Sequence, residues 1–179
     1  MSNRRTLFAD VILPVPIHRA FTYRIPFEMN DDVSVGVRVI FPFGKNKLYT
    51  AIVVNVHENI PANYQSKYIE AVLDHSPIIT SLQLQFWKWI AQYYIAAIGE
   101  VMNAALPANF KLGSETNIQL HPEFDAAIDS LDGRSSEIVE YLETKGSCNL
   151  KELSEFLSIK TVQPIIKSLI EQKILISKE

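Results

Sequence analysis

Two short segments near the N-terminus combine aromatic rings with basic side chains. One is Arg-Ala-Phe-Thr-Tyr-Arg at 19–24, and the other is Val-Ile-Phe-Pro-Phe-Gly-Lys-Asn-Lys at 39–47. Aromatic faces stack on bases and cations meet phosphates, so this mixture suits a surface for single-stranded nucleic acid. Phenylalanine and tyrosine are also good strand residues that fill cores, and composition alone favours that interpretation. The order of the residues has to decide between a binding surface and an interior.

No pattern of a catalytic or metal site accompanies these segments. The four histidines lie far apart, without partners at metal-ligand spacing: His18, His57, His75 and His121. A single cysteine, Cys148, cannot build a zinc site. Gly44-Lys45 lacks the upstream glycine pattern of a phosphate loop. We predict that this chain is not itself an enzyme and carries no catalytic residue, metal site or cofactor of its own.

The first 75 residues are predicted to form short strands joined by proline and glycine turns. Pro14, Pro16 and Pro26 interrupt runs that are rich in β-branched and aromatic residues. Pro-Phe-Gly-Lys at 42–45 is a turn signal. Strands are expected within 8–16, 21–25, 33–41, 49–56 and 68–73. This spacing predicts a small barrel or sandwich.

A helix is expected over 82–94, capped by Thr80 or Ser81. Five apolar residues share one of its faces: Leu82, Phe86, Trp89, Ile90 and Tyr93. Aromatic residues at this spacing more often pack onto a sheet than form a stacking platform. We therefore predict that this face is the hydrophobic seam that closes the first domain, with Trp87 and Tyr94 directed away from it.

A second short helix is expected over 99–105, followed by a candidate linker over 111–115. The remainder of the chain has the pattern of a winged helix. Three helices and a strand are expected there, over 135–145, 150–157, 160–172 and 174–178. Gly146 ends the first of the three and Asn149 caps the second. This is the helix-turn-helix order with its wing cut short. We expect an α+β fold: a β-rich domain closed by a helix pair over 1–112, and a winged helix over 113–179.

The third helix of a winged helix is the one that enters a DNA groove. Four of its polar residues could reach DNA: Lys160, Thr161, Gln163 and Lys167. However, residues 114–179 carry seven basic against twelve acidic residues, whereas residues 1–113 carry ten against eight. Nucleic-acid contact should therefore be local and lie mainly in the first half. Whether the winged helix contacts DNA or docks a protein stays open.

Composition places the chain among ordinary globular proteins. Of its 179 residues, 47% are hydrophobic and 21% are charged. No apolar run approaches the roughly 20 residues that cross a bilayer, and the N-terminus lacks a signal-peptide pattern. One cysteine allows no intrachain disulfide. We expect a cytoplasmic protein without a membrane partner.

Four motifs, in order along the chain, carry a resemblance to a known family. They are Ile-Leu-Pro-Val-Pro-Ile-His-Arg-Ala-Phe-Thr-Tyr-Arg-Ile-Pro at 12–26, Gly-Val-Arg-Val-Ile-Phe-Pro-Phe-Gly at 36–44, Trp-Ile-Ala-Gln-Tyr-Tyr at 89–94 and Gly-Glu-Val-Met-Asn-Ala-Ala-Leu-Pro at 99–107. Over about residues 8–110 the chain resembles the N-terminal region of the PriA family, the bacterial replication-restart helicases also called primosomal protein N′. From 115 onward the resemblance rests on the winged-helix pattern, which lies where that family has its winged helix.

The resemblance implies a role for particular residues. In that family the first domain is a 3′-DNA-binding domain that receives the 3′ end of the nascent leading strand at a stalled fork. Its DNA 3′-end pocket carries over to Phe21, Thr22, Tyr23, Gly44 and Lys67. Better-known members have an aspartate where this chain has Thr22. A threonine hydroxyl can still hydrogen-bond a base edge or a terminal hydroxyl, but it does not provide the charged acceptor of a carboxylate. Further candidate DNA contacts are Arg19, Lys45, Lys47, Lys160 and Lys167.

The resemblance also implies a longer parent protein, an ATP-dependent 3′-to-5′ DNA helicase. Its motor, with the sites for ATP, magnesium and zinc, would follow further along the chain. The expected partners are single-stranded or forked DNA with a free 3′ end, the motor, primosome proteins and single-strand-binding protein, at forks in the bacterial nucleoid. The alternative is a protein-interaction module that docks a motor or a primosome partner without binding DNA itself.

Overall fold

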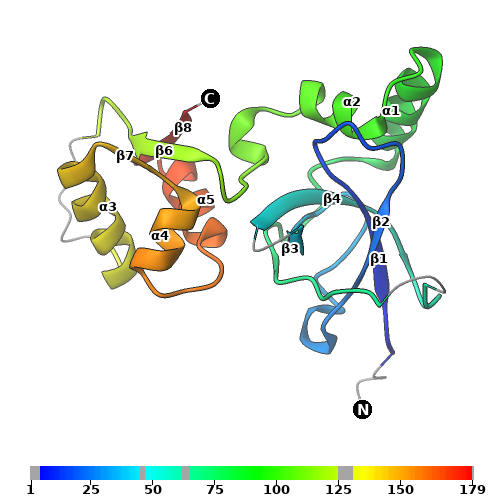
Figure 1. Ribbon diagram of the computed structural model, residues 1–179, viewed down its shortest axis with the longest axis horizontal. Coiled ribbons are helices and arrows are strands. Elements are labelled where there is room, and N and C mark those ends of the chain that lie inside the picture. The colour runs from blue at the N-terminus through cyan, green and yellow to red at the C-terminus, as the bar shows by residue number, and fades with distance from the viewer. Residues whose placement is uncertain (1–4, 45–46, 62–64, 125–130, 179) are drawn as a thin grey trace. The chain divides into compact units, whose positions relative to one another are not determined.

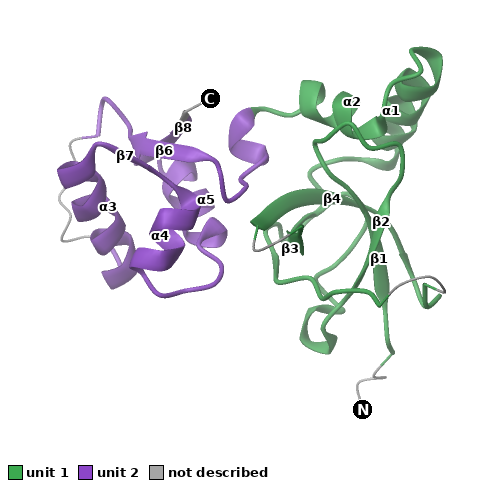
Figure 2. Cartoon of the chain, in the orientation of Figure 1, with its two compact units in different colours: residues 1–107 green, residues 108–179 purple. Residues whose placement is uncertain are grey.

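The computed structural model describes residues 5–44, 47–61, 65–124 and 131–178. The chain divides into two compact units, residues 1–107 and 108–179 (Figure 2). The sequence placed this boundary between residues 112 and 113. The division falls earlier because the 3-10 helix η2 (Ala108–Phe110) contacts a strand of the second unit, and Leu112 is fully buried in that unit's core.

The first unit is built on a five-stranded antiparallel sheet with the order β2-β1-β4-β3-β5. Its strands are β1 (Phe8–Ile12), β2 (Phe21–Arg24), β3 (Arg38–Phe43), β4 (Lys47–His57) and β5 (Ala71–Val72), and a 3-10 helix, η1 (Phe27–Met29), follows β2. The predicted strands are confirmed, although the last one is shorter than expected. β4 is the longest and pairs with both β1 and β3 (Figure 1).

Backbone hydrogen bonds close this sheet on itself. The Arg24 amide, at the end of β2, donates to the Lys67 carbonyl at 2.9 Å, and the Ile69 amide donates back to the Arg24 carbonyl at 3.0 Å. The segment just before β5 therefore pairs with β2, the strand at the opposite edge. Closure removes the open edges of a sheet, so the unit is a small barrel, within the barrel or sandwich class that the sequence predicted.

The barrel interior follows the two-residue period of its strands. Ala9 and Val11 of β1, Val39 and Phe41 of β3, and Val53 of β4 are fully buried in one cluster. Residues that point the other way are also buried in places, Ile40 and Ile52 among them. Part of the sheet is thus covered on both faces.

Two helices follow the barrel strands, as predicted: α1 (Ser81–Tyr93) and α2 (Ile98–Ala105). Thr80 caps α1 through a capping box, in which its hydroxyl accepts from the Gln83 amide and the Gln83 side chain accepts from the Thr80 amide. α2 contacts β1 and buries Val101 and Met102.

The predicted buried face of α1 is wrong. The buried residues are Leu84 and Trp87, and Ile90 is half-buried. The expected seam instead faces solvent, with Leu82 at 74%, Phe86 at 56%, Trp89 at 55% and Tyr93 at 66% exposure. The physical reason is that α1 carries apolar residues around most of its circumference, so periodicity did not fix which side meets the rest of the unit. Val101 and Met102 of α2 are buried in the first unit as well.

The second unit is a winged helix with a three-stranded antiparallel sheet of order β7-β6-β8. Its elements are β6 (Asn117–Leu120), α3 (Gly133–Lys145), β7 (Ser147–Asn149), α4 (Leu150–Phe156), α5 (Gln163–Glu171) and β8 (Leu175–Lys178). The predicted helices and final strand are confirmed, and Asn149 caps α4 as expected. β6 and β7 were not predicted, because both are short and partly polar.

Candidate functional site

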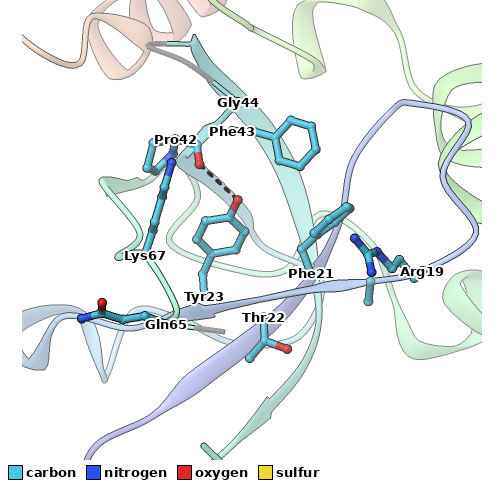
Figure 3. Close-up of a pocket in the computed structure, with 10 residues that line it drawn as sticks. Arg19, Phe21, Thr22, Tyr23, Pro42, Phe43, Gly44, Gln65 and Lys67 are labelled. Atoms are coloured by element: carbon cyan, nitrogen blue, oxygen red, sulfur yellow. Dashed lines mark hydrogen bonds between the residues drawn. The ribbon is translucent and has the colours of Figure 1, made fainter. Parts of the chain in front are cut away.

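A hollow of about 470 Å³ opens in the first unit between β2, the end of β3 and the segment before β5 (Figure 3). Five of the residues that line it are those that the family resemblance assigned to a DNA 3′ end: Phe21, Thr22, Tyr23, Gly44 and Lys67. Arg19, Phe43 and Gln65 line it as well. The fold brings the five residues together from three separate segments of the chain.

The barrel topology explains this convergence. β2 pairs with β1 so that Phe21 lies opposite Val11 and Tyr23 opposite Ala9, which puts both rings on the same side of β2. The Arg24–Lys67 backbone hydrogen bond brings Lys67 beside the end of β2. The Tyr23 hydroxyl donates to the Pro42 carbonyl at 3.1 Å, which ties β2 to the end of β3 just before Gly44.

The two aromatic rings of β2 have different environments. Tyr23 is only 6% exposed, and its ring centroid lies 4.4 Å from that of Phe41 in the core. Tyr23 therefore forms the floor of the hollow. Phe21 is half-buried, with its ring edge-to-face against Phe43 at 5.0 Å and the Arg19 guanidinium 5.2 Å from its centroid. Of the two, Phe21 is the ring that a planar ligand can reach.

Thr22 points to the other side of β2 from these rings (Figure 3). Its hydroxyl donates to Asp10 Oδ1 at 2.6 Å. The same carboxylate accepts from Asn55 Nδ2 at 3.1 Å and lies 3.2 Å from His57 Nε2. Although Thr22 is among the lining residues, its hydroxyl takes part in a polar cluster that connects β2, β1 and β4.

This cluster gives stability a dependence on pH. Burial by itself would raise the pKa of Asp10, but the hydrogen bonds from Thr22, Asn55 and His57 outweigh it and lower the pKa below the ordinary 3.8. Because the pKa of Asp10 is lower in the folded state than in the unfolded state, the ionised carboxylate stabilises the fold. This stabilisation is complete above the unfolded-state pKa and is lost as the pH falls through the folded-state pKa.

We therefore expect the wild type to lose more unfolding free energy than Asp10→Asn between about pH 7 and pH 3. Urea unfolding at both pH values measures this difference. Thr22→Val removes one of the donors and should show an intermediate loss. Identical pH dependence in the wild type and Asp10→Asn would contradict the assignment.

The charge of the hollow suits an anion. Arg19 and Lys67 are both exposed, and neither has a carboxylate within ion-pair distance in the described part of the chain. No aspartate or glutamate is among the described residues that line it. Cations without competing carboxylates attract phosphate groups.

Of the further candidate DNA contacts, Arg19 lines this hollow, whereas Lys47, Lys160 and Lys167 are not among its lining residues. Lys47 begins β4 and is exposed, and Lys45 falls outside the described residues. In the second unit, Lys160 is exposed and precedes α5 instead of lying on it. Lys167, on α5, pairs with Glu171 at 3.6 Å.

Burial removes two polar or cationic side chains from the accessible surface, and one of them was expected to reach DNA. Gln163 is 2% exposed, so the prediction that it reaches DNA is wrong. Arg38, one of the basic residues of the first half, is 3% exposed and paired with Asp74. Phe43 was missed as a pocket residue, although it follows Phe41 by two positions and therefore points to the same side of β3.

Two features are absent from the described residues. No group of three or more histidine, cysteine, aspartate or glutamate side chains is placed there to hold a metal ion. None of the helices in those ranges combines the length and the hydrophobicity that a bilayer crossing needs.

Comparison with known proteins links both units to described families. Residues 10–107 match a family described as the PriA 3′DNA-binding domain (3′BD), and residues 115–179 match one described as a winged helix domain. Replication restart protein PriA of Haemophilus influenzae is 37% identical over 107 residues, which are 58% of this chain and 14% of that protein. Its Bacillus subtilis namesake is 28% identical over 116 residues, which are 63% of this chain and 14% of that protein. The chain thus spans about a seventh of the length of these relatives.

Proposed function

The chain belongs to the PriA 3′DNA-binding-domain family, and on that premise we propose that its β2–β3 hollow captures the free 3′ end of a DNA strand at a stalled replication fork. One observation carries the proposal. The accessible ring of Phe21, the ammonium group of Lys67 and the bare backbone of Gly44 converge on a single hollow from three segments. These are the groups that a terminal nucleotide needs: a face for its base, a cation for its phosphate and room for its sugar.

Each group has a physical role in the proposed complex. Stacking of the last base on Phe21 would contribute about 1–3 kcal/mol. Lys67 would contact one phosphate. Gly44 has φ +68, and, its chain neighbours aside, no atom of the described residues lies within 4 Å of the place where a Cβ would stand, so a nucleotide can approach its backbone closely.

Selectivity for a terminus needs few contacts. The floor formed by Tyr23 and its hydrogen bond to Pro42 limits the depth of the hollow. A limited depth leaves no space for a nucleotide beyond the terminal one, and steric exclusion discriminates ends from continuing strands. This mechanism also agrees with a first half that is only weakly basic.

In the proposed role, capture of the leading-strand 3′ end positions a helicase motor where replication has to resume. The motor, primosome proteins and single-strand-binding protein are the proposed partners, in the bacterial cytoplasm. We assign ATP, magnesium and zinc to the motor portion of such a helicase and not to this chain.

Fluorescence anisotropy with two single strands tests terminus capture. The strands are identical except that one ends in a 3′-hydroxyl and the other in a 3′-phosphate, at one fixed salt concentration. We expect the hydroxyl strand to bind at least about fivefold more tightly, because the added phosphate does not fit beyond the terminal sugar. Phe21→Ala should weaken binding about fivefold or more, and Lys67→Ala should lower the salt dependence by about one phosphate contact.

Phe27→Ala is the matched control, because Phe27 is 47% exposed on the same unit but does not line the hollow. It should bind like the wild type. Equal binding of both strands would reduce the hollow to a general single-strand contact. Unchanged binding by both Phe21→Ala and Lys67→Ala would remove the hollow from consideration altogether.

For the second unit, one observation favours the protein-docking alternative. Lys167, the cation on the helix that would enter a groove, is engaged with Glu171, and residues 114–179 carry a net charge of −5. An acidic surface repels the phosphate backbone. We propose that this unit docks a protein partner, and that Lys167→Ala leaves DNA affinity unchanged.

A further inference from the structure

Helix α1 presents a row of aromatic rings to solvent. Phe86 and Trp89 have ring centroids 5.9 Å apart with planes 10° from parallel, and Trp89 and Tyr93 are 5.3 Å apart at 23°. With Leu82 these three residues form what we term the α1 stripe, and each is more than half exposed. A contiguous apolar patch of this kind on a domain surface marks an interaction site.

Backbone strain lies at the end of the same helix. Ile95 has φ +55, in the left-handed region, and is 87% exposed. A β-branched residue is rare there, at a helix end where glycine is usual. The Ala96 amide donates to the Ala91 carbonyl at 2.9 Å and holds this conformation. The chain thus keeps a large apolar side chain exposed, next in sequence to Tyr93 and Tyr94, in a backbone conformation that is unfavourable for a β-branched residue.

The charges around the stripe suit a polyanion. Residues 75–99 contain no aspartate or glutamate and include Lys88 and His75. Lys88 is exposed, and no carboxylate of the described residues pairs with it. Aromatic rings next to unopposed cations are the combination by which proteins bind single-stranded nucleic acid.

A second hollow, of about 340 Å³, lies on the flank of α1. Lys88, Gln92 and Ile95 line it together with His18, which comes from the loop between β1 and β2. The imidazole of His18, the ammonium group of Lys88 and the side-chain amide of Gln92 offer hydrogen bonds to a phosphate and to the edge of a base.

The same loop connects this flank to the β2–β3 hollow. His18 lines the α1 hollow, and the next residue, Arg19, lines the β2–β3 hollow. Consecutive Cα atoms are about 3.8 Å apart, so the β1–β2 loop contributes neighbouring residues to both hollows. The loop is held against α2 by the close approach of Gly99 to the carbonyl oxygens of Leu13 and Val15.

We propose that α1 is a second contact surface for single-stranded DNA. The strand whose 3′ terminus occupies the β2–β3 hollow continues past Arg19 and His18, its phosphates bind Lys88, and its bases stack on the α1 stripe. The course of the strand rests on the proposed function, whereas the contact between α1 and DNA does not.

Strands of two lengths test the proposal, a four-nucleotide and a twelve-nucleotide DNA that share the same free 3′ end. Trp89→Ala is expected to weaken binding of the longer strand about fivefold or more and to leave the shorter strand within twofold of the wild type. Lys88→Gln should lower the salt slope for the longer strand by about 0.7 and leave the slope for the shorter strand unchanged. Phe27→Ala again serves as the control, and circular dichroism checks that each variant is folded.

Tryptophan fluorescence gives an independent readout, because the chain has two tryptophans and one of them is buried. In Trp87→Phe, Trp89 is the only tryptophan, so emission excited selectively from tryptophan reports on this ring alone. The longer strand should quench its emission and the shorter strand should not, since only a base that reaches α1 can stack on the ring.

The outcomes separate this proposal from terminus capture. If Trp89→Ala and Lys88→Gln both bound the longer strand as tightly as the wild type, and if that strand did not quench Trp89 emission, the α1 contact with DNA would be overturned. The α1 stripe would then be a protein-docking face. That result is compatible with a 3′-hydroxyl preference and with a Phe21→Ala defect on both strands. Conversely, if the wild type showed no preference for the 3′-hydroxyl strand, terminus capture would be overturned. Weaker binding of the longer strand by Trp89→Ala would still support DNA binding by α1.

Discussion

Asp74→Ala is expected to lower the unfolding free energy of the first unit by about 3–5 kcal/mol. Asp74 and Arg38 are both buried, with side chains only 4% exposed. The Asp74 carboxylate accepts from the Arg38 backbone amide and Nε at 2.9 Å each and from a terminal guanidinium nitrogen at 2.7 Å. Removal of the carboxylate leaves a buried cation without this partner, and such a charge costs far more than the pair contributes.

The loss is large relative to the total stability of a small domain, which is of order 5–15 kcal/mol. Arg38 begins β3, and the same strand ends in the residues that form one wall of the β2–β3 hollow. We therefore expect weakened DNA binding together with the loss of stability. Denaturant titration with circular dichroism measures the first effect, and anisotropy below the unfolding transition measures the second.

Glu58→Ala is the matched control for this prediction. Arg5 Nη1 and Glu58 Oε1 lie 3.4 Å apart, but the two side chains are 62% and 60% exposed. An exposed pair contributes about 0–1 kcal/mol, so the variant should unfold close to the wild type. If Asp74→Ala proved as stable as Glu58→Ala, the buried pair would have no structural role of this size.

Gly99→Ala is expected to destabilise the same unit by about 3 kcal/mol, the upper end of the usual cost of overpacking. A Cβ at this position would lie 2.1 Å from the Val15 carbonyl oxygen and 2.2 Å from the Leu13 carbonyl oxygen. Both neighbours are backbone atoms, so no side-chain rotation can relieve the clash. Either α2 or the β1–β2 loop must move.

Displacement of that loop has a functional consequence, because it carries His18 and Arg19. Gly99→Ala should therefore weaken binding of single strands even where it remains folded. Gly133→Ala is the control, since, its chain neighbours aside, no atom of the described ranges lies within 4 Å of its Cβ position, and alanine is favourable in the first turn of α3. Equal melting temperatures for Gly99→Ala and Gly133→Ala would contradict the close packing of α2.

Local rules were sufficient for much of the fold. A strand was predicted within 21–25, and the two-residue period of β2 puts Phe21 and Tyr23 on the same side of the sheet. Thr80 and Asn149 stand at helix N-termini as predicted, because capping depends on residues within one turn. Pro164 lies in the first turn of α5, where its missing N–H leaves no helical bond unmade.

The largest difference between the prediction and the structure concerns which face of α1 is buried, and not the position of the helix. The length and position of α1 were predicted, but its buried side was not, because Leu84 and Trp87 compete with the α1 stripe for the interior. A helix with apolar residues on several sides has no single amphipathic solution. Shape complementarity with the remainder of the unit selects one of them, and that is a property of packing.

The sequence by itself determined the order of elements, the aromatic and basic residue types around the β2–β3 hollow and the family to which they belong. Only the tertiary structure decided which of those side chains a ligand can reach. It buried Arg38 against Asp74, directed the Thr22 hydroxyl to Asp10 and turned the α1 stripe to solvent. Lys67 joins the hollow through a backbone hydrogen bond to a residue 43 positions earlier, Arg24. Period and propensity act over a few residues, whereas closure of a sheet, pairing of buried charges and the roll of a helix depend on contacts between distant segments.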